Sequence, residues 1–208
     1  MKKRIDIETW KRKNQYLFFK QFEEPFYGVC VTIDCTTAYK KAKELNCSFF
    51  LYYLHCSLIA VNEIENFRYR IEDGEAYLYD RVDVSTTVDR PDGTFGISDS
   101  IAYHPDFKIF EAAALDEMGR VRESNHLSPV CGNNVVHYSA IPWIDFTSLS
   151  HARKFSREDS SPKISFGKMT ENEGVRTMPV SIHVHHALVD GSHLGKFTKR
   201  FQELMNES

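Results

Sequence analysis

The order of apolar and polar positions along the chain predicts a mixture of helices and strands. Apolar residues recur at helical spacing over residues 36–45, over residues 107–122 and in the C-terminal segment. We expect the first of these helices to be capped by Thr36 or Thr37. Residues 49–65 are apolar on nearly every side, which is typical of a helix buried under a sheet. The chain therefore carries four helix candidates.

Strand patterns separate these helices. Residues 67–80 alternate between apolar and polar on both sides of Asp73-Gly74, which is a strong hairpin signal. Further strands are predicted at 82–88, from Thr94 onward after the Pro91-Asp92-Gly93 turn, and at 135–143, 163–169 and 178–188. Hairpins mixed with helices, without strict alternation of strand and helix, favour an α+β two-layer sandwich over a doubly wound fold. We expect a mixed β-sheet with helices on one face.

Composition narrows the class of protein. The 208 residues contain no repeat, low-complexity tract or linker, so we expect one domain over residues 1–208. Apolar residues make up 42% and the net charge is -3 without a basic stripe, which supports a packed core and argues against a nucleic-acid surface. Five cysteines without CxxC spacing indicate free thiols, and we expect neither a membrane span nor a signal peptide. These features indicate a cytoplasmic protein.

The segment with the strongest chemical signal is HVHHALVDGSH at residues 183–193. It places an imidazole at the end of a strand beside an acidic turn, where Gly191 permits a tight bend. An imidazole that titrates near neutral pH can act as a general base on a hydroxyl. Two alternatives remain open at this point: ordinary strand histidines, or zinc ligation by His183, His185 and His193. No Cys or further His stands at a familiar zinc spacing, so we expect no metal.

Two motifs resemble one enzyme family. HHALVDG is similar to the HHxxxDG signature of CoA-dependent acyltransferases, which chloramphenicol acetyltransferases, dihydrolipoyl acyltransferases and condensation domains share. Ser139-Ala140-Ile141-Pro142-Trp143 resembles the SAxPW segment of the chloramphenicol acetyltransferases, and its distance from His186 matches the serine-to-histidine separation of that family. Trp10-Lys11-Arg12 and residues 193–197 resemble the first and last segments of the family. The resemblance therefore covers nearly the whole chain.

The resemblance implies catalytic roles. His186 would take the proton from the acceptor hydroxyl as this attacks the acetyl thioester, with its tautomer held by its own backbone carbonyl, and His185 would not be catalytic. Ser139 would donate its hydroxyl to the oxyanion of the tetrahedral intermediate. Asp190 would form a structural salt bridge with Arg12. The absence of a G-x-S-x-G elbow fits direct transfer without a covalent acyl-enzyme.

The resemblance also implies a cosubstrate, which is acetyl-CoA lying in a tunnel. Lys168 matches a basic residue near the CoA site, and Phe50 falls near positions where the family has aromatic partners for the adenine. Together with Ser139, these residues would contact the cosubstrate. Ser165 stands where the family has a threonine that holds a water on the intermediate. The scattered glycines argue against a phosphate-binding loop for a nucleotide.

The acceptor pocket departs from the family pattern. Phe95 matches a phenylalanine that contacts the antibiotic, and Phe19 stands where the family commonly has a pocket tyrosine. His151 replaces a leucine and Ser128 replaces a phenylalanine, so the pocket is more polar. Each lost apolar contact weakens the binding of an aryl acetamide by about 1–3 kcal/mol. The acceptor is therefore chloramphenicol or another hydroxyl compound.

The resemblance finally implies a homotrimer with active sites between subunits. His186 of one subunit would face a pocket built largely by its neighbour, and the side chains of His186 and Ser139 would meet at one channel. Two rival functions remain. A dihydrolipoyl acyltransferase core shares HHxxxDG but normally carries lipoyl and linker regions. The other is a non-catalytic trimer that binds a small molecule on the same scaffold.

Overall fold

A mixed β-sheet forms the centre of the fold. The computed structural model describes residues 1–127, 132–156 and 158–207. Its larger sheet has seven strands in the order β2-β10-β8-β7-β5-β6, and β9 pairs with β10. Strand β7 runs parallel to both of its neighbours, whereas the other pairings are antiparallel. The strands are β2 (Phe26–Asp34), β5 (Asp83–Asp89), β6 (Phe95–Ile97), β7 (Val135–Ala140), β8 (Lys163–Phe166), β9 (Thr170–Asn172) and β10 (Val175–His185).

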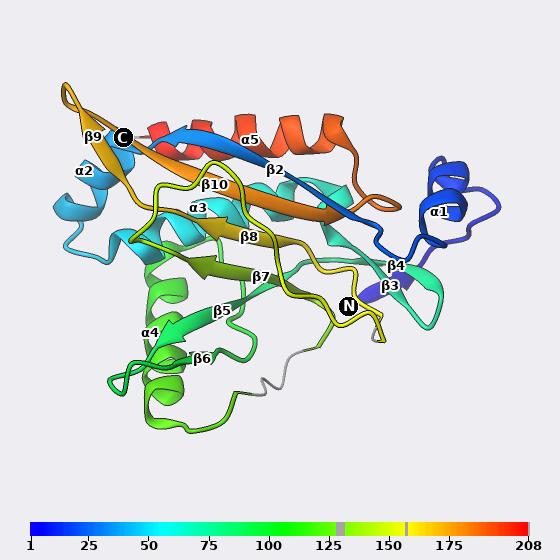
Figure 1. The fold of residues 1–208 in the computed structure, drawn as a ribbon, viewed down its shortest axis with the longest axis horizontal. Coiled ribbons are helices and arrows are strands. Elements are labelled where there is room, and N and C mark those ends of the chain that lie inside the picture. The colour runs from blue at the N-terminus through cyan, green and yellow to red at the C-terminus, as the bar shows by residue number, and fades with distance from the viewer. Residues whose placement is uncertain (128–131, 157, 208) are drawn as a thin grey trace.

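Helices cover one face of this sheet (Figure 1). They are α2 (Thr36–Glu44), α3 (Phe49–Glu63), α4 (Phe107–Glu123) and α5 (Gly191–Asn206). Helix α3 lies in the core and is buried around most of its circumference, as its apolar sequence predicts. The predicted two-layer α+β sandwich is therefore confirmed. Within the described residues no single helix is long and apolar enough to cross a membrane; α2 and α3 together meet that criterion, with a bend of 120° between them.

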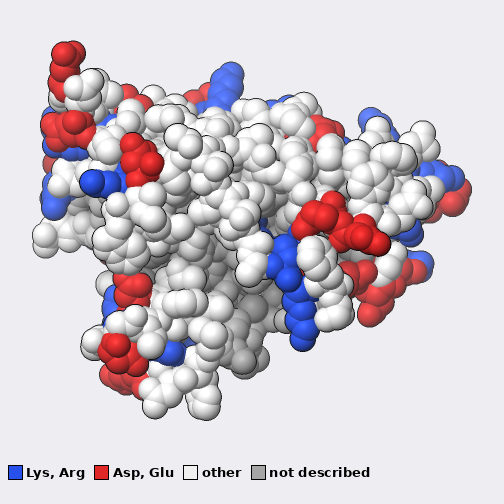
Figure 2. All heavy atoms as spheres, in the orientation of Figure 1, with Lys and Arg blue, Asp and Glu red and all other residues white. Residues whose placement is uncertain are grey.

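The alternation of side chains along β10 explains why the sheet face opposite the helices has different side chains from the face that the helices cover. Val180, Ile182 and Val184 point to the helices and have no exposed surface. The alternate residues therefore lie on the face that no helix covers. The segment that follows β7 runs across this face (Figure 1). In the same orientation, Figure 2 shows charged side chains mainly toward the edges of the face and an uncharged central region.

A second, three-stranded sheet lies beside the N-terminus. It consists of β1 (Lys2–Arg4), β4 (Glu75–Tyr79) and β3 (Tyr69–Glu72), and the short helices α1 (Lys13–Phe19) and η1 (Glu65–Arg68) lie nearby in the chain. The predicted hairpin is confirmed. Asp73 and Gly74 have φ values of 52° and 74°, which are the positive angles that a tight two-residue hairpin turn requires.

A buried arginine joins the hairpin to the main sheet. Arg70 has no exposed surface, and its guanidinium donates hydrogen bonds of 2.7–2.9 Å to the backbone carbonyls of Phe67, Tyr69, Asn133 and Val135. Burial lowers the pKa of Arg70 to about 10, so the group stays charged at neutral pH. The four carbonyls satisfy a charge that would otherwise be costly to bury. Arg70 thereby fixes the start of β7 against β3.

Several predicted boundaries were wrong. The N-cap of α2 is Cys35, and neither Thr36 nor Thr37 caps the helix; instead, the carboxylate of Asp34 accepts a hydrogen bond from the Thr36 backbone N–H. The strands predicted to reach residues 143, 169 and 188 end at Ala140, Phe166 and His185. Strands β7 and β10 are followed by turns and β8 by an irregular segment, and the periodic pattern carries no signal for either.

Five elements were not predicted, namely α1, η1, β1, β2 and β9, and two of them, α1 and β2, contribute to the candidate site. Helix α1 is only seven residues long, which is too short for a clear apolar periodicity. Strand β2 contains alternating β-branched residues (Val29, Val31 and Ile33), so the sequence did carry a strand signal there. Strand β2 pairs with β10 along nine residues and brings Tyr27 close to the HHALVDG segment.

Candidate active site

His186 directly follows the last residue of β10, and two aromatic rings pack against its imidazole. The ring of Phe19 stacks on it, with centroids 3.9 Å apart and an interplanar angle of 6°. The ring of Tyr27 lies 4.2 Å away at 32°. The backbone N–H of His186 donates to the carbonyl of Pro25 at 2.9 Å. Residues from α1 and β2 therefore fix the orientation of the imidazole.

The two nitrogens of this imidazole have different surroundings. Nδ1 is buried and has no hydrogen-bond partner in another described residue. The hydroxyl of Tyr27 is also buried without such a partner, and burial raises the pKa of Tyr27 to about 12. The phenol is thus neutral at physiological pH. Because Nδ1 is enclosed, any proton transfer with a ligand must use Nε2.

An ion pair braces the backbone on the C-terminal side of His186. Nη1 of Arg12 donates to Oδ2 of Asp190 at 2.7 Å, as the resemblance implied. The same guanidinium donates to the backbone carbonyls of His186 and Ala187, each at 3.3 Å. Asp190 is the N-cap of α5 and accepts from the backbone N–H of Ser192. Arg12 therefore ties α5 and the end of β10 to the segment before α1.

The ion pair makes stability depend on pH at acidic values. Burial opposes the ionisation of Asp190, but hydrogen bonds from Arg12 and Ser192 and the nearby positive charges outweigh burial and lower its pKa to about 2. A lowered pKa stabilises the folded state above the unfolded value of about 3.9, and the contribution is lost as the pH falls toward 2. The side chain of Asp190 is 36% exposed, so solvent screening reduces the contribution to about 1 kcal/mol.

We expect Asp190→Asn to lower the free energy of unfolding by about 1 kcal/mol at pH 7, because it removes this ion pair. Urea unfolding between pH 2 and pH 7 measures the effect. The difference from the wild type should shrink as the pH falls from about 4 to 2, where the native carboxylate is protonated in any case. The matched control is Asp116→Asn on the exposed surface of α4. A difference that stays constant over this range would contradict the assigned role.

Three serines form a second polar group, on the sheet face that no helix covers. Ser139 on β7, Ser165 on β8 and Ser181 on β10 are direct neighbours in register, and we call them the serine row. The Oγ atoms of Ser139 and Ser165 lie 2.6 Å apart, and Ser181 contacts Nδ1 of His183 at 3.1 Å. Ser165 and Ser181 are buried, whereas Ser139 is partly exposed. Ser139 is thus the member that a ligand can reach.

One chain does not bring His186 and Ser139 together. His186 follows Ser181 by five residues, and Ser139 lies two strands away from Ser181. Strands rise about 3.3 Å per residue and lie about 4.8 Å apart, so the two Cα atoms are roughly 19 Å apart. Within one chain these two side chains therefore do not meet, and their expected meeting at a channel between subunits stays a prediction.

The remaining predicted site residues are dispersed. Lys168 follows β8 and is exposed, while Phe50 is in the first turn of α3 and is partly buried. Phe95 on β6 is 48% exposed. The imidazole of His151 packs edge-on against that of His183, with centroids 4.8 Å apart. Ser128 lies outside the described residues.

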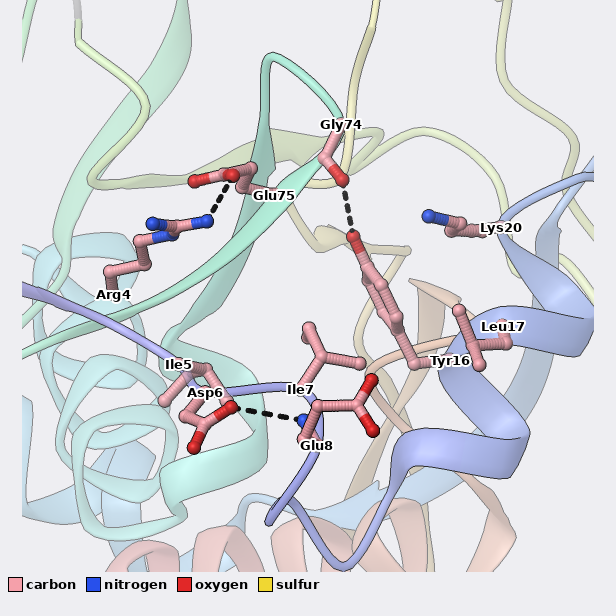
Figure 3. A pocket seen from close by; sticks show the side chains of 10 residues that line it. All are labelled: Arg4, Ile5, Asp6, Ile7, Glu8, Tyr16, Leu17, Lys20, Gly74 and Glu75. Atoms are coloured by element: carbon pink, nitrogen blue, oxygen red, sulfur yellow. Dashed lines mark hydrogen bonds and ion pairs between the residues drawn. The ribbon is translucent and has the colours of Figure 1, made fainter.

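A hollow of about 460 Å³ lies between α1 and the β3–β4 hairpin, but it contains none of the predicted site residues (Figure 3). The hydroxyl of Tyr16 donates to the carbonyl of Gly74 at 2.8 Å there, and Arg4 pairs with Glu75. In the described part of the chain, no group of three or more His, Cys, Asp or Glu residues is arranged to hold a metal ion. His193, one of the three possible zinc ligands, takes part in the N-cap of α5 instead.

The sequence analysis did not identify Tyr27 beside His186 or Ser181 in the serine row. Tyr27 packs against His186, but only the pairing of β2 with β10 brings it there. Ser181 completes the serine row through the register of three strands. The strand pattern around Tyr27 could have indicated β2, whereas nothing in the sequence around Ser181 indicates its partners.

Comparisons with known proteins agree on one family. The model of the family described as chloramphenicol acetyltransferase matches residues 2–202. Chloramphenicol acetyltransferase 3 from Escherichia coli is 28% identical over 205 residues, which cover 98% of this chain and 96% of that protein. A solved structure of a chloramphenicol acetyltransferase superposes with a TM-score of 0.91 and 32% identity, and covers 99% of this chain and 100% of that one. The similarity extends over the full length of both proteins.

More distant structures share only the fold. A truncated catalytic core of the 2-oxoacid dehydrogenase multienzyme complex from Thermoplasma acidophilum has a TM-score of 0.67 and 18% identity, and covers 93% of this chain and 92% of that one. This likeness shows the fold alone. It carries no information about which acceptor this chain uses.

Proposed function

This chain belongs to the chloramphenicol acetyltransferase family and is an acyltransferase, and we propose that it transfers acetyl directly from acetyl-CoA to an acceptor hydroxyl. The observation that carries the proposal is the family match over residues 2–202, which includes both HHALVDG and SAIPW. The orientation of His186 between ordered aromatic rings supports the same chemistry. Acetyl-CoA is a substrate of this reaction.

In the proposed mechanism His186 is the general base. Nε2 takes the proton of the acceptor hydroxyl while the hydroxyl oxygen attacks the carbonyl carbon of the thioester. The C–S bond then breaks, and the proton passes from the imidazolium to the sulfur, so that an acetyl ester and free CoA leave. Phe19 and Tyr27 hold the ring for this transfer, and Arg12 holds the backbone that carries it. A fixed orientation reduces the entropy lost on reaching the transition state.

Ser139 is proposed to donate its hydroxyl to the oxyanion that forms on the thioester carbonyl. Its hydrogen bond with Ser165 supports this role, because one hydroxyl of the pair can accept a proton while the other donates to the ligand. Ser165 is fully buried, so it is suited to position Ser139 or a bound water. Stabilising an oxyanion in this way typically contributes about 10²–10³ in rate.

The proposal requires a complex of several copies of the chain. His186 and Ser139 of one chain are roughly 19 Å apart. One acceptor hydroxyl therefore cannot lose its proton to His186 and attack a thioester whose oxyanion is bound by Ser139 of the same chain. A homotrimer in which His186 of one subunit faces Ser139 of its neighbour removes this conflict. Large apolar side chains on the surface near the serine row support an interface, since Trp143 is 70% and Ile144 56% exposed.

The test is the release of free CoA from acetyl-CoA, detected by a thiol-reactive dye, across a panel of alcohols that includes chloramphenicol. We expect CoA to appear only when an acceptor is present, because the mechanism has no acyl-enzyme that water could hydrolyse. Mass spectrometry of the acetylated alcohol completes the assay. If no alcohol leads to CoA release, the protein is a non-catalytic binding module on the same scaffold.

A further inference from the structure

A row of basic side chains lies next to the serine row on the uncovered sheet face. His137 on β7, Lys163 on β8 and His183 on β10 are in register, and we call them the basic row. Each member precedes or follows a serine of the serine row by two residues, so both rows point to the same face. Two residues along a strand span roughly 7 Å. A small alcohol whose hydroxyl lies at Ser139 can therefore extend over the basic row.

A hollow of about 220 Å³ lies against the basic row, which is large enough for part of a small molecule. Its lining includes Tyr27, His151, Arg153, Lys163 and His183. The sequence makes room for this arrangement at Gly28, because a Cβ there would come within 2.4 Å of the His183 ring. The hollow is therefore lined mainly by polar and aromatic side chains.

Two basic side chains, Arg153 and Lys163, line this hollow together with the carboxylate of Glu24. The side chains of Arg153 and Lys163 are each only 11% exposed. Lys163 donates to Asp159 at 2.5 Å, and Arg153 donates to Glu24 at 2.7 Å. Glu24 is 47% exposed, so it can turn into solvent and leave Arg153 to a ligand. Nε of Arg153 also lies 3.9 Å from Asp159, and the guanidinium still has N–H donors that neither carboxylate uses.

Burial is the main reason why the imidazoles in this hollow have lowered pKa values, and the positive electrostatic potential of nearby basic groups adds to it. Burial and the charges of Lys163 and neighbouring groups lower the pKa of His151 to about 4, and the pKa of His183 is lowered by burial and by Lys163. Nε2 of His151 is buried and has no hydrogen-bond partner in the described chain. A negatively charged ligand would relieve this potential and give that nitrogen a partner.

We infer that the acceptor is an anionic alcohol, whose carboxylate or similar group binds at the basic row while the hydroxyl that is acetylated lies at Ser139. The inference rests on the proposed function and specifies its acceptor. Lys163, Arg153 and His151 bind the anionic end of the molecule, and Ser139 contacts the reacting end. A neutral aryl acetamide would gain no charged contact from Lys163 or Arg153.

The test compares two alcohols of nearly equal size, 4-(hydroxymethyl)benzoate and its neutral methyl ester, in the CoA-release assay. We expect kcat/KM to be at least about tenfold higher for the carboxylate in the wild type, which corresponds to one well-placed charged contact. Equal or better use of the ester, with transfer occurring, would overturn the inference and leave the proposed function standing.

Substitutions test which side chains produce the preference for the carboxylate over the ester. Lys163→Met should reduce the carboxylate-to-ester ratio to about one, and Lys163→Arg should retain most of it, because the charge is kept. Lys199→Met, an exposed lysine of α5, is the matched control. Because Lys163→Met removes the nearest cation of Asp159, a second variant, His151→Leu, changes the pocket while this ion pair stays intact. It should lower the ratio severalfold, and an unchanged ratio in both variants would exclude this site.

Calorimetric binding of 4-(hydroxymethyl)benzoate without acetyl-CoA separates failure of the inference from failure of the proposed function. Binding that Lys163→Met abolishes, in a protein that acetylates no alcohol, would retain the anion site and refute the transferase. The absence of binding in the wild type, together with acetylation of the ester, would refute the anion site alone.

Discussion

Replacing His186 with alanine is expected to lower kcat for acetyl transfer by roughly 10²–10⁴-fold, which is the usual contribution of a general base. The variant keeps the fold, because the imidazole packs against Phe19 and Tyr27 at the end of β10 without a hydrogen bond from Nδ1 to another described residue. The KM for acetyl-CoA should change little. Steady-state CoA release with an accepted alcohol measures the effect.

The control for this experiment is His126→Ala, which removes an exposed imidazole after α4. It should behave as the wild type. Unfolding curves of both variants verify that lost activity is not lost structure. Full acetyl transfer by His186→Ala would exclude the imidazole as the base, and the other assigned roles would lose their basis with it.

The sequence predicted the parts of the fold that depend on local periodicity. The alternation of Val180, Ile182 and Val184 indicates a strand with one face in the core, and Asp73-Gly74 indicates the hairpin turn. The apolar circumference of α3 indicates a helix beneath the sheet. In each case the residues that make the pattern are close together in the chain, so a single sequence suffices to recognise it.

Features that depend on distant residues were not predictable in this way. The serine row exists only because the register of β7, β8 and β10 aligns Ser139, Ser165 and Ser181. Arg70 has the sequence context of an exposed strand residue, yet backbone carbonyls from two separate segments enclose it. Register between strands far apart in the chain is set by tertiary packing, which propensity does not encode.

Motif similarity predicted the Arg12–Asp190 pair correctly, whereas the meeting of His186 with Ser139, which the resemblance places between subunits, stays a prediction that one chain does not test. The two motifs share a reaction, and a shared reaction suggests neighbouring side chains. The topology instead places the motifs at different positions along the sheet. A motif therefore identifies chemistry, but the number of copies needed to assemble that chemistry depends on three-dimensional distances.

Ser139→Ala is expected to lower kcat by roughly 10²–10³-fold, which is the usual loss when one oxyanion donor is removed. The change deletes a partly exposed hydroxyl and leaves Ser165 in the buried position beside it, so the fold persists. Ser181→Ala removes the third member of the serine row and is the matched control. It should retain activity, because Ser181 contacts His183 and not Ser139. Comparable losses in both variants would point to a purely structural serine row.

Mixing the two inactive variants tests whether the active site lies between subunits. Random reassembly of His186→Ala with Ser139→Ala chains gives about one quarter of the interfaces an intact His186 from one copy and an intact Ser139 from another. Activity should therefore return to about a quarter of the wild-type value after the chains are unfolded and refolded together, and stay low when preformed complexes are only mixed. Sedimentation equilibrium should give the mass of a trimer for each variant. If cofolding restores no activity, His186 and Ser139 do not form a site between subunits. Because roughly 19 Å separates them within one chain, the roles assigned to this pair would then be refuted.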